Sequence, residues 1–193
     1  FPADVEDAIS SKIVSQIHDG LVKFSTKDLS ILNAIADNWT IDESQTVYTF
    51  TLKDNVYFHN DACFDEGKGR KVIASDFKYA FEIMTSKETS QNTHLFKDRI
   101  IGASDYYEGK ASEISGIQAV DDKTLKITIV KPQSSFIYLL ALPNSAVIAH
   151  EAFDKYGNKM TVGAGAFKYV EPTSPSKTCL SYNENYYLND EEG

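Results

Sequence analysis

An alternation of apolar and polar side chains marks the middle of the chain. Three apolar residues lie two positions apart and form one face of a predicted strand: Leu125, Ile127 and Ile129. Asp121-Asp122-Lys123, just before them, is a turn sequence, because an Asp side chain can accept from the backbone N–H two residues further on. Pro132 has no N–H to donate and ends the sheet. We therefore expect a hairpin over Gly116–Val130, then a short helix over Phe136–Leu142 capped by Ser134 or Ser135.

Two further stretches have the spacing of an amphipathic helix. Apolar residues fall at Phe77, Ala80, Phe81 and Met84, and Ser75 stands where an N-cap is expected. Nearer the N-terminus a second apolar stripe consists of Ile9, Ile13, Val14 and Ile17. Gly20 follows that stripe and is expected to end its helix.

The remaining patterns are short strands. Tyr48, Phe50 and Leu52 alternate with polar residues and predict a strand that pairs with Trp39-Thr40-Ile41. Further strands are expected at Leu21–Phe24, Phe167–Val170 and Lys177–Tyr182, whereas Ile31–Ala36 reads as an apolar turn. Many short strands with interspersed helices predict an α+β or α/β body.

Composition narrows the function classes. The 193 residues carry a net charge of −9, which argues against a nucleic-acid surface, because binding phosphates requires clustered Lys and Arg. No run of about 18 apolar residues exists that would predict a membrane span. The chain opens on Phe1-Pro2 without an initiating Met, so we expect a mature or shortened piece. Cys63 and Cys179 can pair or remain free.

Candidate chemistry is sparse. His59, Asp61 and Cys63 lie two residues apart and could ligate a metal or form a nucleophile, but their spacing fits no standard zinc motif. Gly163-x-Gly165 lacks the third glycine and the helix of a phosphate loop, so a tight strand entry is favoured. Gly67–Lys71 is a basic loop that an anion could contact, although an exposed loop is the simpler interpretation. These residues favour binding over catalysis.

Six ordered segments resemble the family 5 extracellular solute-binding proteins, the oligopeptide- and dipeptide-binding components of ABC importers. The first three are an early helix ending in an acidic-Gly-Leu corner (11–21), a strand pair that runs from Trp to Phe (36–58) and a helix start (72–77). The other three are the central hairpin (116–140), a Gly-rich strand (162–169) and a segment from Asn to Tyr (183–187). The chain departs from the family pattern at Phe1, at Ala166, at Tyr187 and in the longer 60–71 loop.

The resemblance implies part of lobe I of a bilobed, type II periplasmic-binding-protein-like fold. A small β-rich subdomain over 21–149 is expected to be inserted in a mixed-sheet domain that bears the hinge. That second domain would be formed by 1–20 and 150–193 and would be incomplete. The second lobe of the same chain, which supplies much of the ligand pocket in peptide binders, is expected to be a missing partner.

The resemblance also implies function and site. A ligand peptide would add as a strand beside Glu6, Asp7 and Ala8, because Pro2 matches the family's Asp-Pro proline. The link after the Phe77–Met84 helix reaches the cleft in relatives and nominates Thr93 and His94. We expect capture of peptides at the periplasmic or extracellular face and delivery to a membrane permease, without cofactor, metal or catalysis. Other cargo (nickel, haem or sugar), lipid anchoring and a hydrolase or metalloenzyme built on His59, Asp61 and Cys63 stay open.

Overall fold

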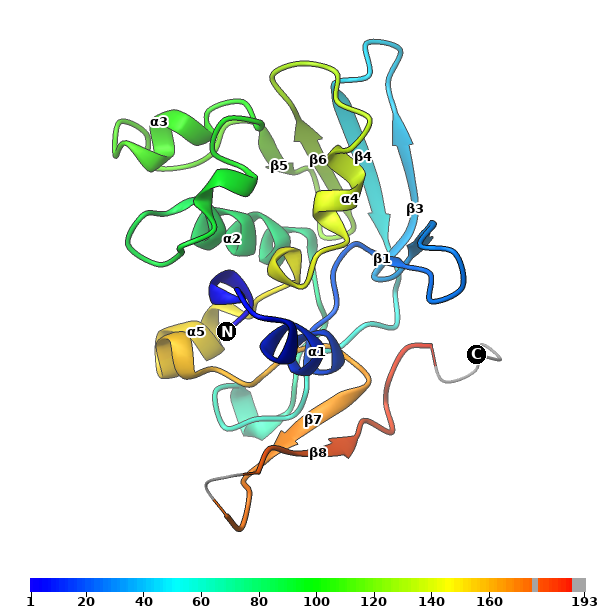
Figure 1. Cartoon of the computed structure of the whole chain (residues 1–193), viewed down its shortest axis with the longest axis vertical. Coiled ribbons are helices and arrows are strands. Elements are labelled where there is room, and N and C mark those ends of the chain that lie inside the picture. Colours follow the sequence, from blue (N-terminus) through cyan, green and yellow to red (C-terminus); the bar gives the residue numbers. More distant parts are fainter. Residues whose placement is uncertain (175–176, 189–193) are drawn as a thin grey trace.

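A four-stranded antiparallel sheet forms the upper part of the molecule in this computed structural model, which describes residues 1–174 and 177–188 (Figure 1). Its strands lie in the order β3-β4-β6-β5. They span Ala36–Ile41 (β3), Val47–Leu52 (β4), Thr124–Thr128 (β6) and Ile117–Ala119 (β5). The expected hairpin is confirmed, and Asp121 Oδ1 accepts from the backbone N–H groups of Lys123 and Thr124 in its turn.

The register of the sheet places its apolar side chains on one face. Phe50 lies opposite both Trp39 and Leu125, and Tyr48 lies opposite Ile127. Tyr48, Phe50, Leu125 and Ile127 are at most 1% exposed, as the alternating pattern predicted. Helix α2 (Ala74–Thr85) contacts β5 and β6 and contributes its fully buried phenylalanines to this core.

The start of α2 differs from the sequence prediction. The N-cap is Ile73, and Ser75 lies inside the first turn. The carboxylate of Asp76 accepts from the N–H of Ile73 at 2.9 Å, so an acidic side chain stabilises this helix start. The helix predicted after Pro132 is α4 (Phe136–Leu140), whose N-cap Ser135 makes no side-chain capping bond. Instead, the Ser135 hydroxyl accepts from the Gln133 side-chain amide.

A second small sheet corrects the expected apolar turn at Ile31–Ala36. Strand β2 (Ile31–Asn33) pairs antiparallel with β1 (Val22–Phe24), with Val22 opposite Asn33. The strand expected at Leu21–Phe24 is confirmed as β1, whereas the three residues of β2 are too few for a period of two to be recognised.

The N-terminal and C-terminal parts of the chain pack together below the large sheet (Figure 1). Helix α1 (Ala8–Ile17) packs against β7 (Phe167–Val170), which pairs with β8 (Cys179–Tyr182). Two expectations for α1 were wrong. Ile9 is 74% exposed although it belongs to the apolar stripe, and the helix ends at Ile17 with His18 as its C-cap, ahead of Gly20.

Two short helices complete the α-helices of the described residues, α3 (Ala103–Tyr107) and α5 (His150–Tyr156). The Phe1 ring stacks on Phe153 of α5 with centroids 5.3 Å apart, which fixes the N-terminus near α5. No helix among residues 1–174 and 177–188 has the length and apolar character needed to cross a bilayer.

Candidate functional site

The segment before α1 is an extended stretch of backbone held against the body of the protein. A 3-10 helix over Pro2–Asp4 comes first and buries Pro2 and Ala3. Val5 (φ −71°, ψ 118°) and Asp7 (φ −115°, ψ 158°) then have extended backbone angles. The chain therefore passes from one helix to the next through a short stretch with strand-like geometry.

Three side chains from distant parts of the chain hold this segment. Asn92 Nδ2 donates to the carbonyls of Ala3 at 2.9 Å and Val5 at 3.3 Å. Asn144 Nδ2 donates to the carbonyls of Pro2 and Val5, both at 3.1 Å. The buried Ser90 hydroxyl donates to the carbonyl of Ala3 at 3.0 Å. These hydrogen bonds go to backbone carbonyls, so they fix the path of residues 2–5 independently of the side chains there. The residues that follow, Glu6 to Ala8, therefore start from a defined position.

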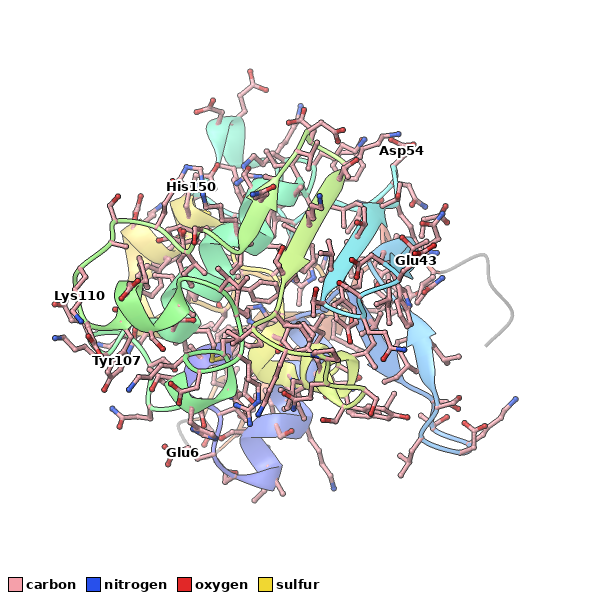
Figure 2. The ribbon with its side chains drawn as sticks, turned by 90° about the horizontal axis from the view of Figure 1, so that it is seen from above. Glu6, Glu43, Asp54, Tyr107, Lys110 and His150 are labelled. Atoms are coloured by element: carbon pink, nitrogen blue, oxygen red, sulfur yellow. The ribbon has the colours of Figure 1, made fainter. Side chains whose placement is uncertain are left out.

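Glu6, Asp7 and Ala8, the predicted pairing segment, are all exposed. Figure 2 shows Glu6 at the outer edge of the molecule. Asp7 has a local role as well, because its Oδ1 accepts from the N–H groups of Ile9 and Ser10 at 2.9 Å and caps α1. Hydrogen bonds from Ser10 lower the pKa of Asp7, so its carboxylate stays charged near the helix N-terminus. No backbone hydrogen bond of Glu6 exists within the described part of the chain.

Thr93 and His94, the predicted residues of the link after α2, lie in a 3-10 helix over Thr93–Leu95. Thr93 is half-buried and His94 is exposed. The preceding residue, Asn92, is the side chain that bonds to Ala3 and Val5. The structure thus joins the residue before Thr93 to the residues just before Glu6, across more than 80 positions in sequence.

Ser90, Asn92 and Asn144 were missed by sequence reasoning. Ser90 and Asn92 lie in a polar link and Asn144 follows Pro143, so none of them belongs to a periodic pattern of apolar residues. No short sequence motif identifies a side chain whose hydrogen bond goes to a backbone carbonyl 87 or more residues away. The one available signal is an Asn or Ser in a link that a family resemblance already places at the cleft.

The alternative site at His59, Asp61 and Cys63 has the geometry of a structural cluster. Buried His59 contacts the carbonyl of Gly165 through Nε2 at 2.9 Å. Asp61 Oδ1 accepts from the N–H of Cys63 and from the Tyr156 hydroxyl. Burial and the Asp61 carboxylate raise the pKa of Cys63 to about 12, the opposite of what a nucleophilic thiol requires. Within residues 1–174 and 177–188, no group of three potential metal ligands is gathered.

The two glycine-containing loops also have structural roles. Gly165 N–H donates to the Ile17 carbonyl at 2.8 Å, and a Cβ on Gly163 would lie 2.1 Å from that same oxygen. The glycines therefore permit close contact between α1 and the entry to β7, as the sequence favoured. In the basic loop, Arg70 forms ion pairs with Asp76 and Glu151, so this guanidinium is neutralised by protein carboxylates.

Comparisons with known proteins identify relatives of the chain in sequence and in fold. The model for "Bacterial extracellular solute-binding proteins, family 5 Middle" matches residues 30–192. The chain is 27% identical over 170 residues to the glutathione-binding protein GsiB of Salmonella paratyphi A, covering 86% of this chain and 29% of that protein. It is 28% identical over 192 residues to a dipeptide-binding protein of Lactococcus lactis, covering 94% and 33%. The chain thus spans about a third of the length of these relatives.

Solved structures show the same fold. The periplasmic oligopeptide-binding protein OppAIV of Borrelia burgdorferi superposes with a TM-score of 0.86 at 29% identity, over 98% of this chain and 38% of that one. Listeria monocytogenes OppA bound to peptide superposes with a TM-score of 0.82 at 26% identity, over 98% and 37%. The mixed α/β architecture is thus that of periplasmic oligopeptide-binding proteins. These relatives are transport-associated binding proteins, not enzymes, and since the family model covers most of the sequence, the chain belongs to the family 5 bacterial extracellular solute-binding proteins.

Proposed function

We propose that the whole protein captures peptides and delivers them to the permease of an ABC importer. The observation that carries the proposal is the extended segment around Val5, which Asn92 and Asn144 fix by its carbonyls. Glu6, Asp7 and Ala8 follow this segment and are exposed, and Thr93 and His94 directly follow Asn92 in the chain. A peptide adding as a strand there would be recognised by its main chain, with side-chain selectivity from neighbouring residues.

The two-part organisation expected from the resemblance belongs to the same proposal. Residues 21–149 would form a β-rich subdomain, and 1–20 with 150–193 would form part of the hinge-bearing domain. A second lobe of the same chain would close over the ligand from the opposite side. Enclosure supplies much of the affinity of small-ligand sites, so the 193-residue chain alone is expected to bind peptides weakly.

The place of action follows from the same family. Its members are extracellular solute-binding proteins, and the structural relative OppAIV is named as periplasmic. We propose that the protein works at the periplasmic or extracellular face of the membrane, with a lipid anchor on the full-length protein where no outer membrane retains it. The permease subunits would be its membrane partners.

Isothermal titration calorimetry of the full-length protein tests the cargo. Short unblocked peptides of two to five residues should release heat with dissociation constants in the micromolar range or below. Nickel, haem and simple sugars serve as competing cargoes in parallel titrations. Heat from one of these and from no peptide would contradict the proposal. Delivery is tested by loss of peptide uptake on deletion of the gene and its restoration by the intact protein.

A further inference from the structure

Ile9, the second residue of α1, has an apolar side chain that the body of the protein leaves uncovered. Its exposed fraction is 74%, the largest among the large apolar side chains of residues 1–174 and 177–188. Further along the helix the same stripe is buried, since Val14 and Ile17 are 7% and 3% exposed. The apolar stripe therefore extends beyond the elements that cover it, and its uncovered end lies next to the residues predicted to pair with a ligand.

The geometry of a helix start directs this side chain toward the pairing segment. In an α-helix each Cα–Cβ bond tilts toward the N-terminus, so a side chain covers the surface of the turn that precedes its own Cα. For Ile9, in the first turn, that surface is the end of the extended segment, Glu6 to Ala8. A hydrogen bond joins the two, because Asp7 Oδ1 accepts from the Ile9 N–H at 2.9 Å.

The neighbouring side chains leave Ile9 to supply the larger apolar surface at this place. The carboxylate of Asp7 is occupied as the helix cap, since it also accepts from the Ser10 N–H at 2.9 Å. Glu6 lies at the outer edge of the molecule (Figure 2), and Ala8 adds only a methyl group. A β-branched side chain in a helix has one strongly preferred rotamer, so the Ile9 side chain is ordered before a ligand arrives and costs little entropy on binding.

We propose that Ile9 is a specificity-determining residue, which selects peptides with an apolar side chain at the ligand residue that pairs beside Ala8. This inference rests on the proposed function and names the class of peptide that the site prefers. Pairing along Glu6 to Ala8 would hold any peptide by its main chain. A ligand side chain such as Leu, laid against Ile9, removes apolar surface of both residues from water. A polar side chain in the same place loses water without gaining a hydrogen bond.

The other candidate for covering Ile9 is the second lobe when it closes over the ligand. A contact between Ile9 and that lobe would strengthen the binding of all peptides equally. A contact between Ile9 and the ligand strengthens only those peptides that carry an apolar residue at one position. The direction of the Ile9 side chain, toward the segment that pairs with the peptide, favours the ligand.

Calorimetry of the full-length protein with a series of tripeptides tests the inference. Leu or Gln replaces each residue of an alanine tripeptide in turn, because these two side chains have similar length and differ in polarity. Ile9→Gln removes the apolar surface at an exposed position, where the fold does not depend on it, and Ile9→Leu retains that surface. Leu29→Gln is the control, since Leu29 in the β1–β2 turn is an apolar side chain of similar exposure, 69%.

At one position of the tripeptide, the wild type should bind the Leu peptide about tenfold more tightly than the Gln peptide. Ile9→Gln should abolish this preference, whereas Ile9→Leu and Leu29→Gln should keep it. A preference that survives in Ile9→Gln would overturn the inference. So would an equal loss of affinity for the Leu and Gln peptides in that variant, because it indicates a contact with the second lobe. If the wild type prefers Leu at no position, the inference is wrong while peptide capture stands. If no peptide binds the full-length protein, the proposed function fails as well.

Discussion

The Nε of Arg70 donates to Oε1 of Glu151 at 2.6 Å, which ties the loop before α2 to the start of α5. The same guanidinium donates to both oxygens of Asp76 at 2.7 and 2.8 Å. Asp76 in turn caps α2 and is only 3% exposed. One arginine thus joins a helix start in the proposed subdomain to a helix in the proposed hinge-bearing domain.

Replacing Arg70 should therefore destabilise the whole chain. Arg70→Gln leaves two carboxylates without their cation, one of them buried, and we expect a loss of about 3 kcal/mol in the free energy of unfolding. Urea unfolding monitored by circular dichroism measures it. Lys68→Gln is the matched control, because Lys68 in the same loop is 76% exposed and its pair with Glu66 spans 3.6 Å. Equal stability of the two variants would show that the Arg70 cluster contributes nothing beyond surface charge.

His18 should make the protein less stable in mild acid. Burial lowers the pKa of His18 to about 3, and the neighbouring His59 adds to this effect. In the unfolded chain a histidine binds a proton near pH 6.5, whereas in the folded protein His18 stays neutral until about pH 3. Because acid therefore favours the unfolded state, the free energy of unfolding falls as the pH drops below 6.5 and continues to fall toward pH 3. Between pH 7.5 and pH 5, this one group accounts for a loss of about 2 kcal/mol.

The measurement is urea unfolding at both pH values in wild type and His18→Gln. The variant should lose less stability on acidification, because it has no group to protonate at that position. Asp19, whose pKa is raised by burial, acts in the opposite direction in both proteins and therefore cancels in the comparison. His94→Gln, at an exposed site, should keep the wild-type dependence. An unchanged acid response in His18→Gln would contradict the assignment.

The alternating strands were predictable because their information is local. The spacing of Leu125, Ile127 and Ile129, every second residue, identifies the buried face of their strand. The turn at Asp121 is formed by hydrogen bonds to residues two and three positions later, so it too is encoded locally. Ile9 was misread, since a helical period marks a face without showing how far neighbouring elements cover it. The family resemblance nominated the pairing segment, but neither period nor motif identifies Asn92 or Asn144, whose bonds join residues 87 to 142 positions apart.

Asn92 and Asn144 should affect ligand binding through the segment they hold. Asn92→Ala removes one of the two side-chain hydrogen bonds to each of the Ala3 and Val5 carbonyls, which keep Ser90 and Asn144 as donors, so we expect about 1 kcal/mol less stability. Loosening the pairing segment should also weaken peptide binding by about tenfold, because the ligand must then order it. Hydrogen exchange at residues 5–8 and calorimetry of the full-length protein measure these effects.

A matched control for these variants is Asn38→Ala, an exposed asparagine on β3. It should leave both hydrogen exchange at residues 5–8 and the peptide affinity at wild-type values. Full peptide affinity in an Asn92→Ala, Asn144→Ala double variant that is still folded would show that the extended segment is not part of the ligand site.

Gly163 should tolerate no side chain. A Cβ at this position would lie 2.1 Å from the Ile17 carbonyl oxygen and 2.8 Å from His18 Nδ1, and the Ile17 backbone cannot move without shifting the end of α1. We expect Gly163→Ala to cost more than about 3 kcal/mol in the free energy of unfolding. Gly109→Ala is the comparison: Gly109 has φ +75° with open space around it, so only backbone strain of about 1 kcal/mol applies. Thermal unfolding of Gly163→Ala and Gly109→Ala compares the two losses of stability. A larger loss for Gly163→Ala shows that close backbone approach requires the glycine, whereas equal losses would contradict this.

Cys63 should react slowly with alkylating reagents although it is only partly buried. Burial and the adjacent Asp61 carboxylate raise its pKa to about 12, so at pH 8 about one molecule in 10,000 carries the reactive thiolate. Iodoacetamide labelling followed by peptide mass spectrometry should give a rate for Cys63 far below that of glutathione in the same tube. Asp61→Asn removes the repelling charge and should speed the labelling, whereas Asp65→Asn, an exposed acid on the same loop, should leave it unchanged. Rapid labelling of wild-type Cys63 would reopen a nucleophilic role for the thiol, and Cys63→Ala would then be expected to alter function instead of preserving it.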